Sequence, residues 1–151
     1  MLDISKIRIT RNRSFYHYTD QFTLHYKGKE YTPVKASGRI VFKIGIYAVK
    51  FDPDDAQSIR NEVELYDRLP KKDKQHFVKI YSYDFRKKIM VVRFMDFLPG
   101  AKGRTIAKKG IIKRLVDKYQ IEDVCTWSTN NWGICQKTKR PVIYDWEYNY
   151  A

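Results

Sequence analysis

The sequence has 151 residues, of which 43% are hydrophobic, and this is enough for one domain with a single core. The formal net charge of +13 favours an anionic partner, such as a nucleotide, nucleic acid or an acidic protein. No apolar run reaches the roughly 18 residues of a membrane helix and the amino terminus does not resemble a signal peptide, so we expect a cytoplasmic protein without membrane contact.

Cysteine and histidine usage argues against a metal centre built from these residue types. Cys125 and Cys135 lie ten positions apart with no Cys/His pair nearby, so we expect neither a zinc site nor a disulfide framework, and a reducing compartment fits better. The histidines also lack the spacing of metal ligands; they are His17, His25 and His76.

The first third of the chain has the pattern of antiparallel strands. Residues 22–26 and 30–34 flank Lys27-Gly28-Lys29, which predicts a β-hairpin, and residues 6–10 alternate between polar and apolar side chains. Residues 11–18 mix basic with aromatic side chains, and such a mixture can stack on bases and neutralise phosphates. An edge strand whose long side chains extend to solvent is the favoured alternative.

A second hairpin is predicted around Gly45, which separates two apolar runs between residues 39 and 50. Ser37 and Gly38 form a turn before it, and the backbone N–H groups of such a turn can approach a phosphate; Val41 follows. The turn has only one glycine of a G-x-G-x-x-G loop, so the turn alone is a weak signal for a phosphate-binding loop.

Lys50 ends the second strand of this hairpin and needs an anionic partner, because burying an unpaired ammonium is costly. Asp52 is a candidate N-cap and Pro53 suits the first helical position, so we expect a helix from Pro53 that ends before Pro70. Glu62 flanks the apolar stripe of this helix and can point towards the sheet, which makes it the candidate partner of Lys50. The stripe consists of Ala56, Ile59, Val63, Tyr66 and Leu69.

Two further strands and a second helix follow. Residues 77–83 and 88–95 have strand patterns, residues 96–100 form a connector, and residues 104–119 predict a helix. This helix lies in the most basic region of the chain, which is usually a solvated face but also suits an acidic protein or nucleic acid. The basic residues are Lys102, Arg104, Lys108, Lys109, Lys113, Arg114 and Lys118.

The last segment predicts a short hairpin, in which residues 132–136 and 141–145 flank a turn. Asn131 precedes its first strand and Asp145 ends its second, so these two side chains can lie at the same end of the hairpin. Magnesium binds few protein oxygens together with phosphates and water, which suits one Asn and one Asp. Alternatively, Asn131 only caps a turn and Asp145 only ends a strand.

The order of these features resembles the protein-kinase fold, most closely the short kinase-like proteins of bacteriophages. The series spans residues 34–147 and consists of the glycine turn, Val41, Ala48-Val49-Lys50, Glu62, two strands, a connector, a helix, Asn131 and Asp145. The resemblance implies an α+β fold with an antiparallel amino-terminal sheet, one packed helix and a reduced carboxy-terminal lobe.

The resemblance also implies a site for ATP and magnesium. Lys50 would hold the α- and β-phosphates and pair with Glu62, while Gly38 and Val41 would contact the nucleotide. Asn131 and Asp145 would bind magnesium. Asp145 would stand where the family has the aspartate of Asp-Phe-Gly, and the triplet here is Asp145-Trp146-Glu147.

Two departures from the family pattern bear on catalysis. The family's catalytic base lies five residues before the metal-binding asparagine, and that position here is Thr126, which cannot accept a proton. Asp123 lies eight residues before Asn131 and would serve only if the loop is three residues longer. The sequence also ends six residues after Asp145, which leaves no room for an activation segment or for helices that bind a peptide.

Nucleotide binding is therefore a safer expectation than protein phosphorylation, and three functions stay open. The first is a minimal ATP-dependent phosphotransferase that acts on a protein, with Lys50, Glu62 and Asp123 as its catalytic residues. The second is a pseudokinase, such as a phage protein that disables an acidic host protein in the host cytoplasm. The third is a basic nucleic-acid-binding protein unrelated to kinases.

For the structure, we expect a single kinase-like domain in two lobes. A sheet lobe should cover about residues 1–95, and a small helix and hairpin lobe about residues 96–151. The sheet should have about five antiparallel strands and pack on the helix over residues 53–69.

Overall fold

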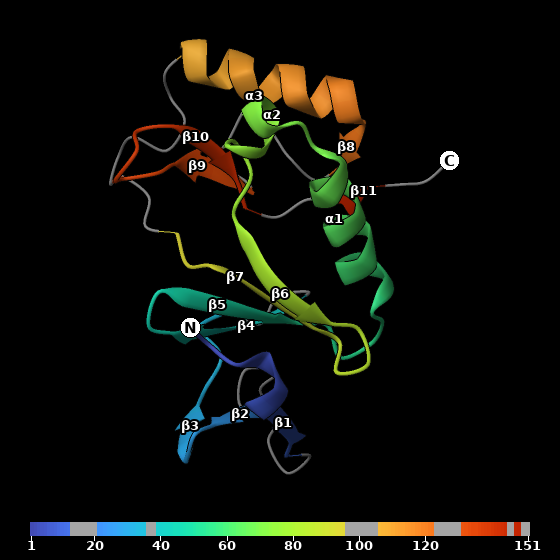
Figure 1. Cartoon of the computed structure of the whole chain (residues 1–151), viewed down its shortest axis with the longest axis vertical. Coiled ribbons are helices and arrows are strands. Elements are labelled where there is room, and N and C mark those ends of the chain that lie inside the picture. Colours follow the sequence, from blue (N-terminus) through green and yellow to red (C-terminus); the bar gives the residue numbers. More distant parts are fainter. Residues whose placement is uncertain (13–20, 36–38, 96–105, 123–130, 145–146, 149–151) are drawn as a thin grey trace. The chain divides into compact units, whose positions relative to one another are not determined.

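The computed structural model describes the chain except for residues 13–20, 36–38, 96–105, 123–130, 145–146 and 149–151. Its architecture is α+β with antiparallel sheets, as the sequence predicts (Figure 1). The elements form two compact units. The first unit comprises Met1–Ile59 and Ile80–Phe94, and the second comprises Arg60–Lys79 and Met95–Ala151.

A three-stranded sheet in the order β1-β2-β3 opens the first unit. Its elements are the 3₁₀ helix η1 (Ile4–Lys6), β1 (Arg8–Arg11), β2 (Phe22–Tyr26) and β3 (Lys29–Tyr31). Strand β2 forms because every second side chain, at Phe22, Leu24 and Tyr26, is apolar and buried. Lys27 and Gly28 have φ angles of +47° and +76°, the conformation of a two-residue type I′ turn, which confirms the first predicted hairpin.

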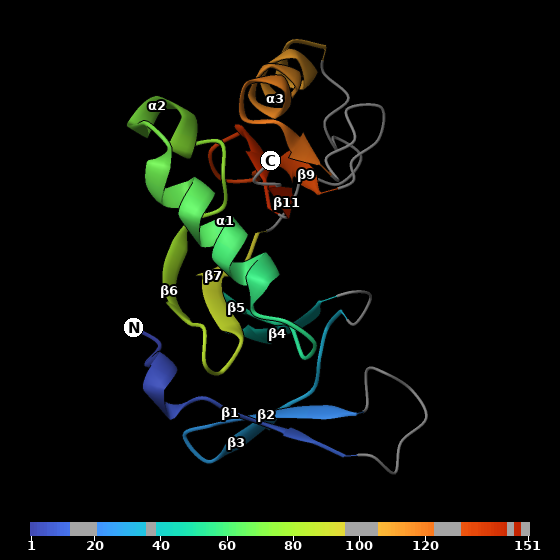
Figure 2. The same cartoon turned by 90° about the vertical axis from the view of Figure 1, so that its right-hand side faces the viewer.

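A four-stranded sheet completes the first unit, and Figure 2 shows its strands in the order β6, β7, β5 and β4. The strands are β4 (Ile40–Ile44), β5 (Tyr47–Phe51), β6 (Ile80–Asp84) and β7 (Ile89–Arg93). Gly45 has a φ angle of +60° at the first central position of the β4–β5 turn, where type II′ hairpins favour glycine. The second predicted hairpin is therefore confirmed.

The two sheets of the first unit share one hydrophobic core. Phe22 and Leu24 enter it from the small sheet, and Phe42, Val49 and Val91 enter it from the large one. The sequence predicted one sheet of about five strands, but the amino-terminal strands form a sheet of their own. Because their alternating apolar side chains are buried in the shared core, the small sheet packs on the large sheet instead of extending it.

Helix α1 (Gln57–Arg68) begins later than the predicted Pro53, because the side chain of Asp52 organises a turn before it. Asp52 Oδ1 accepts a hydrogen bond from the backbone N–H of Asp54 at 3.1 Å, and Oδ2 accepts one from the Ser58 hydroxyl at 2.6 Å. Side-chain bonds of this kind compete with the helical backbone ladder. Asp52 therefore organises the turn that leads into the helix and is not the helix N-cap that the sequence predicted.

The second unit contains two more helices and two short sheets. Its other elements are α2 (Lys71–Lys74), α3 (Ile106–Tyr119), β8 (Ile121–Glu122), β9 (Trp132–Ile134), β10 (Pro141–Ile143) and β11 (Glu147–Tyr148). The antiparallel pair β9–β10 confirms the predicted last hairpin. The pairing of β8 with β11 was not predicted, because strands of two residues are too short to show a periodic pattern.

The segment just before β6 belongs to the second unit and pairs with β10. Phe77 forms a parallel bridge with Ile143, and the N–H of Val78 donates to the Ile143 carbonyl at 2.8 Å. The strand predicted over residues 77–83 therefore begins only at Ile80. Helix α3 packs on β10 and buries Ile112 and Leu115, two of the residues from which its apolar face was predicted.

Candidate functional site

Lys50 lies in β5, the strand of the large sheet that pairs with both β4 and β7. It is directly opposite Val41 on β4 and Met90 on β7. Directly opposed residues project from the same face of a sheet, so Lys50 is flanked on both sides by apolar side chains. Only 6% of its surface is exposed.

The face that carries Lys50 is the one turned away from the core of the first unit. Val49 projects to the other face and joins that core, because successive strand residues point to opposite sides. Ala48, two positions before Lys50, shares the face of Lys50 and is also buried. The structure thus brings together Val41, Ala48 and Lys50, as the predicted hairpin requires.

A buried ammonium on an apolar sheet face has a specific chemical consequence. Its charge needs an anion or hydrogen-bond acceptors, because an unpaired charge at such a place is costly. A phosphate that reaches it would gain a strong electrostatic interaction, since little water screens the charge there. Lys50 is buried between apolar neighbours, and its role in binding phosphate stays a prediction.

Glu62 lies in α1 and is fully buried, although its neighbour Glu64 is exposed. The burial of Glu62 beside Val63 agrees with the prediction that it flanks the apolar stripe of the helix and points inwards. Glu62 belongs to the second unit and Lys50 to the first. The ion pair between them stays a prediction.

Asn131 precedes β9 and has a φ angle of +65°, a left-handed conformation that asparagine adopts more readily than most residues. Its carbonyl accepts a hydrogen bond from the N–H of Tyr144 at 3.0 Å, and its N–H donates to the Tyr144 hydroxyl at 3.2 Å. Asn131 is thus paired with the residue just before Asp145. Asp145 itself lies outside the described residues, so the shared magnesium site stays a prediction.

Other predicted site residues also lie outside the part of the chain that the structure describes. They are Gly38 in the phosphate turn and both candidates for the base position, Asp123 and Thr126. The basic and aromatic residues from Arg13 to Tyr18 fall there as well. The roles assigned to these residues in the sequence analysis stay predictions.

The described histidines contact hydroxyl, carboxylate and carbonyl groups of the chain. His25 Nε2 lies 2.9 Å from the hydroxyl of Thr10, and its Nδ1 lies 3.7 Å from the carboxylate of Glu30. His76 is buried, and its Nδ1 lies 2.9 Å from the carbonyl oxygen of Pro141. Within the described ranges, no three side chains of His, Cys, Asp or Glu gather in a way that would hold a metal ion.

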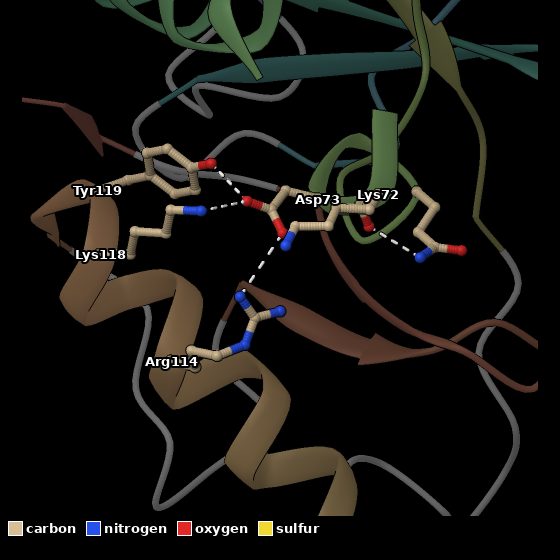
Figure 3. A network of polar contacts seen from close by, with 6 residues as sticks. Lys72, Asp73, Arg114, Lys118 and Tyr119 are labelled. Atoms are coloured by element: carbon tan, nitrogen blue, oxygen red, sulfur yellow. Dashed lines mark hydrogen bonds and ion pairs between the residues drawn. The ribbon is translucent and has the colours of Figure 1, made fainter. Parts of the chain in front are cut away.

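A polar network that was not predicted from the sequence lies around Asp73 and links α2 to the end of α3 (Figure 3). The Asp73 carboxylate is fully buried and accepts hydrogen bonds from the Tyr119 hydroxyl at 2.5 Å and from Lys118 Nζ at 3.0 Å. Arg114 Nη1 lies 3.6 Å from its other oxygen. Both hydrogen bonds reach one carboxylate oxygen, and Arg114 forms an ion pair with the other, so Asp73 serves as a structural link between two helices.

The network decides the charge of Asp73. Burial by itself raises the pKa of the Asp73 carboxyl, but hydrogen bonds from Tyr119 and Lys118 and the charges of Lys118 and Arg114 outweigh burial and hold the pKa below its ordinary value. The same hydrogen bond to Asp73 raises the pKa of Lys118. Both groups are therefore charged at neutral pH.

A sequence signal for this network exists, but it is easily missed. Asp73 is the single acidic residue in Lys71-Lys72-Asp73-Lys74, a stretch with the composition of a solvated turn. Tyr119 ends the predicted apolar stripe of α3 and carries a polar hydroxyl, which needs a partner when it is buried. Only the folded chain shows that the Tyr119 hydroxyl donates its hydrogen bond to Asp73.

None of the described helices is long and apolar enough to cross a membrane. Comparisons of the chain with protein-family models, with curated proteins and with solved structures found no match. The interpretation of the site therefore rests on the residues and contacts of this chain alone.

Proposed function

We propose that this chain is a kinase-like nucleotide-binding protein that holds ATP on the sheet face carrying Val41, Ala48 and Lys50. The observation that supports the proposal most directly is the β4–β5 register, in which Val41 is opposite Lys50 and Ala48 shares their face. Aliphatic side chains beside a buried ammonium suit a nucleotide, because the base packs against the apolar atoms and the phosphates meet the charge.

The remaining predicted residues have defined roles in this proposal. Glu62, which is buried in α1, orients Lys50 towards the phosphates, and Gly38 lets the backbone approach them. Asn131 and Asp145 supply oxygen ligands to magnesium, which neutralises phosphate charge when it is bound. The amide of Asn131 and the carboxylate of Asp145 are ligand types that magnesium accepts.

The proposal is tested by thermal unfolding with and without ATP and magnesium. A ligand present at about 100 times its Kd adds about 2.7 kcal/mol of stability, which raises the melting temperature of a chain of this size by several degrees. Lys50→Met should abolish this shift while circular dichroism shows the same fold. Lys29→Met is the matched control, because Lys29 is exposed in the small sheet and should leave the shift unchanged.

Two outcomes would contradict nucleotide binding at this face. One is a wild-type melting temperature that does not respond to ATP with magnesium at millimolar concentration. The other is a shift that Lys50→Met retains in full, because the nucleotide would then bind elsewhere. A loss that is equal in both variants would also count against the proposal, since it would reflect net charge and not the site.

Phosphoryl transfer is a further step that needs a proton acceptor beside the acceptor hydroxyl. The assay is transfer of labelled γ-phosphate to the protein itself and to a generic protein substrate, with wild type and Asp123→Ala. Robust transfer that Asp123→Ala abolishes assigns the base to Asp123 and makes the chain an enzyme. Nucleotide binding without transfer makes it a pseudokinase scaffold that acts by binding a partner.

A further inference from the structure

The second unit carries a strongly basic surface that the proposed nucleotide site does not use. Three of its segments contribute: α2, the exposed side of α3 and the turn between β9 and β10. Among the described residues of these segments, the only acidic side chain with an exposed position is Asp117. The exposed basic side chains, which we call the basic surface, are Lys71, Lys72, Lys113, Arg114, Lys118, Lys137, Lys139 and Arg140.

Polar contacts hold the three segments together. Asp73 of α2 accepts hydrogen bonds from Lys118 and Tyr119 at the end of α3. His76, just after α2, lies with Nδ1 2.9 Å from the carbonyl oxygen of Pro141, the residue that follows the β9–β10 turn. The three segments that carry the cations of the basic surface are therefore linked to one another by these contacts.

Part of the basic surface is ordered before any ligand arrives. Asp73 holds Arg114 and Lys118, yet 51% and 45% of these side chains stay exposed, so they keep N–H donors for a ligand (Figure 3). Side chains that are already held lose less conformational entropy on binding. The single charge of Asp73 offsets only one of the cations on the basic surface.

We propose that the basic surface binds the phosphate backbone of duplex nucleic acid. An acidic protein is the competing partner, but protein interfaces depend on apolar and aromatic side chains at their centre and are depleted in lysine. Among the described residues, the exposed large hydrophobic side chains are Met1, Val34, Ile46 and Tyr83, and all four belong to the first unit. A surface that carries cations but no exposed large hydrophobic side chain suits the phosphate backbone, because charge alone is sufficient to bind it.

The chemistry of the surface sets the kind of binding. Lysine and arginine donate hydrogen bonds and accept none, so contacts with phosphates position the nucleic acid without reading its sequence. No exposed aromatic side chain of the three segments, within the described residues, offers a platform on which unpaired bases stack. Duplexes of unrelated sequence should therefore bind equally well, and at least as tightly as single strands.

The test measures fluorescence anisotropy of a labelled DNA duplex of about 20 base pairs over a series of potassium chloride concentrations. The logarithm of the binding constant should fall linearly with the logarithm of salt concentration, by about 0.9 for each phosphate neutralised. Lys71→Gln/Lys72→Gln and Lys137→Gln/Arg140→Gln should each lower the slope by about 1.8, because each removes two contacts. Lys6→Gln/Lys29→Gln removes the same charge from exposed positions of the first unit and should leave the slope unchanged.

Three results would overturn the proposal. The first is an absence of duplex binding at low salt, and the second is a control variant that lowers the slope as much as the two test variants. The third is a polyglutamate chain of equal charge that binds as tightly as the duplex and loses affinity in the same variants, which would assign the surface to an acidic protein. Lys50→Met should leave duplex binding unchanged, so this inference and the proposed nucleotide site fail or succeed separately.

Discussion

At the scale of single residues, Asp73 shows how a buried carboxylate keeps its charge. Burial alone would favour the neutral acid, yet a hydroxyl, an ammonium and a guanidinium from α3 all face the carboxylate. These groups belong to Tyr119, Lys118 and Arg114, which lie close together on the last turns of one helix, so a single helix end supplies all three. This gives the network measurable consequences for stability.

Removing one donor should weaken the link between α2 and α3. Tyr119→Phe keeps the ring, which packs edge-on against Phe77, but deletes a hydrogen bond to a charged group. We expect a loss of about 1.5–3 kcal/mol in the free energy of unfolding, measured by urea denaturation. Tyr83→Phe is the matched control, because Tyr83 is 45% exposed and its substitution should change stability by less than about 0.5 kcal/mol. Equal losses in the two variants would contradict a structural role for the network.

The lowered pKa of Asp73 also makes a signed prediction about pH. Because the folded-state pKa lies below the ordinary value of 3.8, the stabilisation is fully present above that value and is lost as pH falls through the folded pKa. Asp73→Asn should therefore be less stable than wild type at neutral pH, and the difference should shrink below about pH 3.8. Asp3, whose pKa is lowered by hydrogen bonds from Ser5, is present in both proteins, so its effect cancels in the difference. A difference that is constant down to about pH 2.5 would contradict the assignment.

At the scale of elements, backbone conformation at turns decides where strands and helices begin and end. Gly45 turns the chain between β4 and β5 with φ at +60°, and this turn sets the register that places Val41 opposite Lys50. Gly110 lies inside α3, where glycine is a poor helix former. At neither glycine would an added Cβ meet another atom within 4 Å, so substitution tests backbone conformation alone.

Alanine should therefore have opposite effects at the two glycines. Gly45→Ala should cost about 1–2 kcal/mol, because a left-handed conformation brings Cβ close to the backbone carbonyl. Gly110→Ala should add about 0.5–1 kcal/mol, because alanine loses less backbone entropy in a helix. Urea denaturation midpoints with unchanged slopes would measure both changes. A stabilising Gly45→Ala would contradict the left-handed turn, and a destabilising Gly110→Ala would contradict the helical conformation of α3 at that position.

At the scale of the whole molecule, the excess of positive charge is not confined to one region. Within the net charge of +13, the first unit carries +7 and the second carries +6. The charge as a whole attracts any polyanion at long range, while the arrangement of cations on the basic surface determines where a duplex would be held. The same excess has a cost for the folded state, because like charges repel in a compact chain.

Salt should therefore act on folding and on nucleic-acid binding in opposite directions. Raising potassium chloride from about 0.02 M to about 0.3 M shortens the Debye length and screens the repulsion, so the free energy of unfolding should rise by an amount on the order of 1 kcal/mol. Duplex binding should weaken over the same range. Urea denaturation at each salt concentration measures the first effect. Stability that falls with salt would show that favourable ion pairs outweigh the repulsion.

Local sequence pattern was sufficient for the elements whose signal is contained within a few residues. The alternation of Phe22, Leu24 and Tyr26 identified β2, and Gly28 and Gly45 identified two hairpin turns. Asp52 and Pro70 indicated the neighbourhood in which a helix begins and ends, although a side-chain turn moved the first helical residue to Gln57. In the candidate site, the hairpin pattern alone placed Val41 and Lys50 on neighbouring strands.

Tertiary structure decided the features that depend on partners far apart in the chain. Whether the first strands extend the large sheet or pack on it depends on which face the core covers, and a period of two specifies only that one face is apolar. Asp73 and Tyr119 are 46 positions apart, so neither residue's neighbours reveal the other. Phe77 likewise continues a strand pattern but pairs with Ile143 instead of a β7 residue. The sequence by itself determined which residues turn, alternate and carry charge, whereas the fold determined which of them meet, because a local pattern encodes conformation and exposure but not the identity of a distant partner.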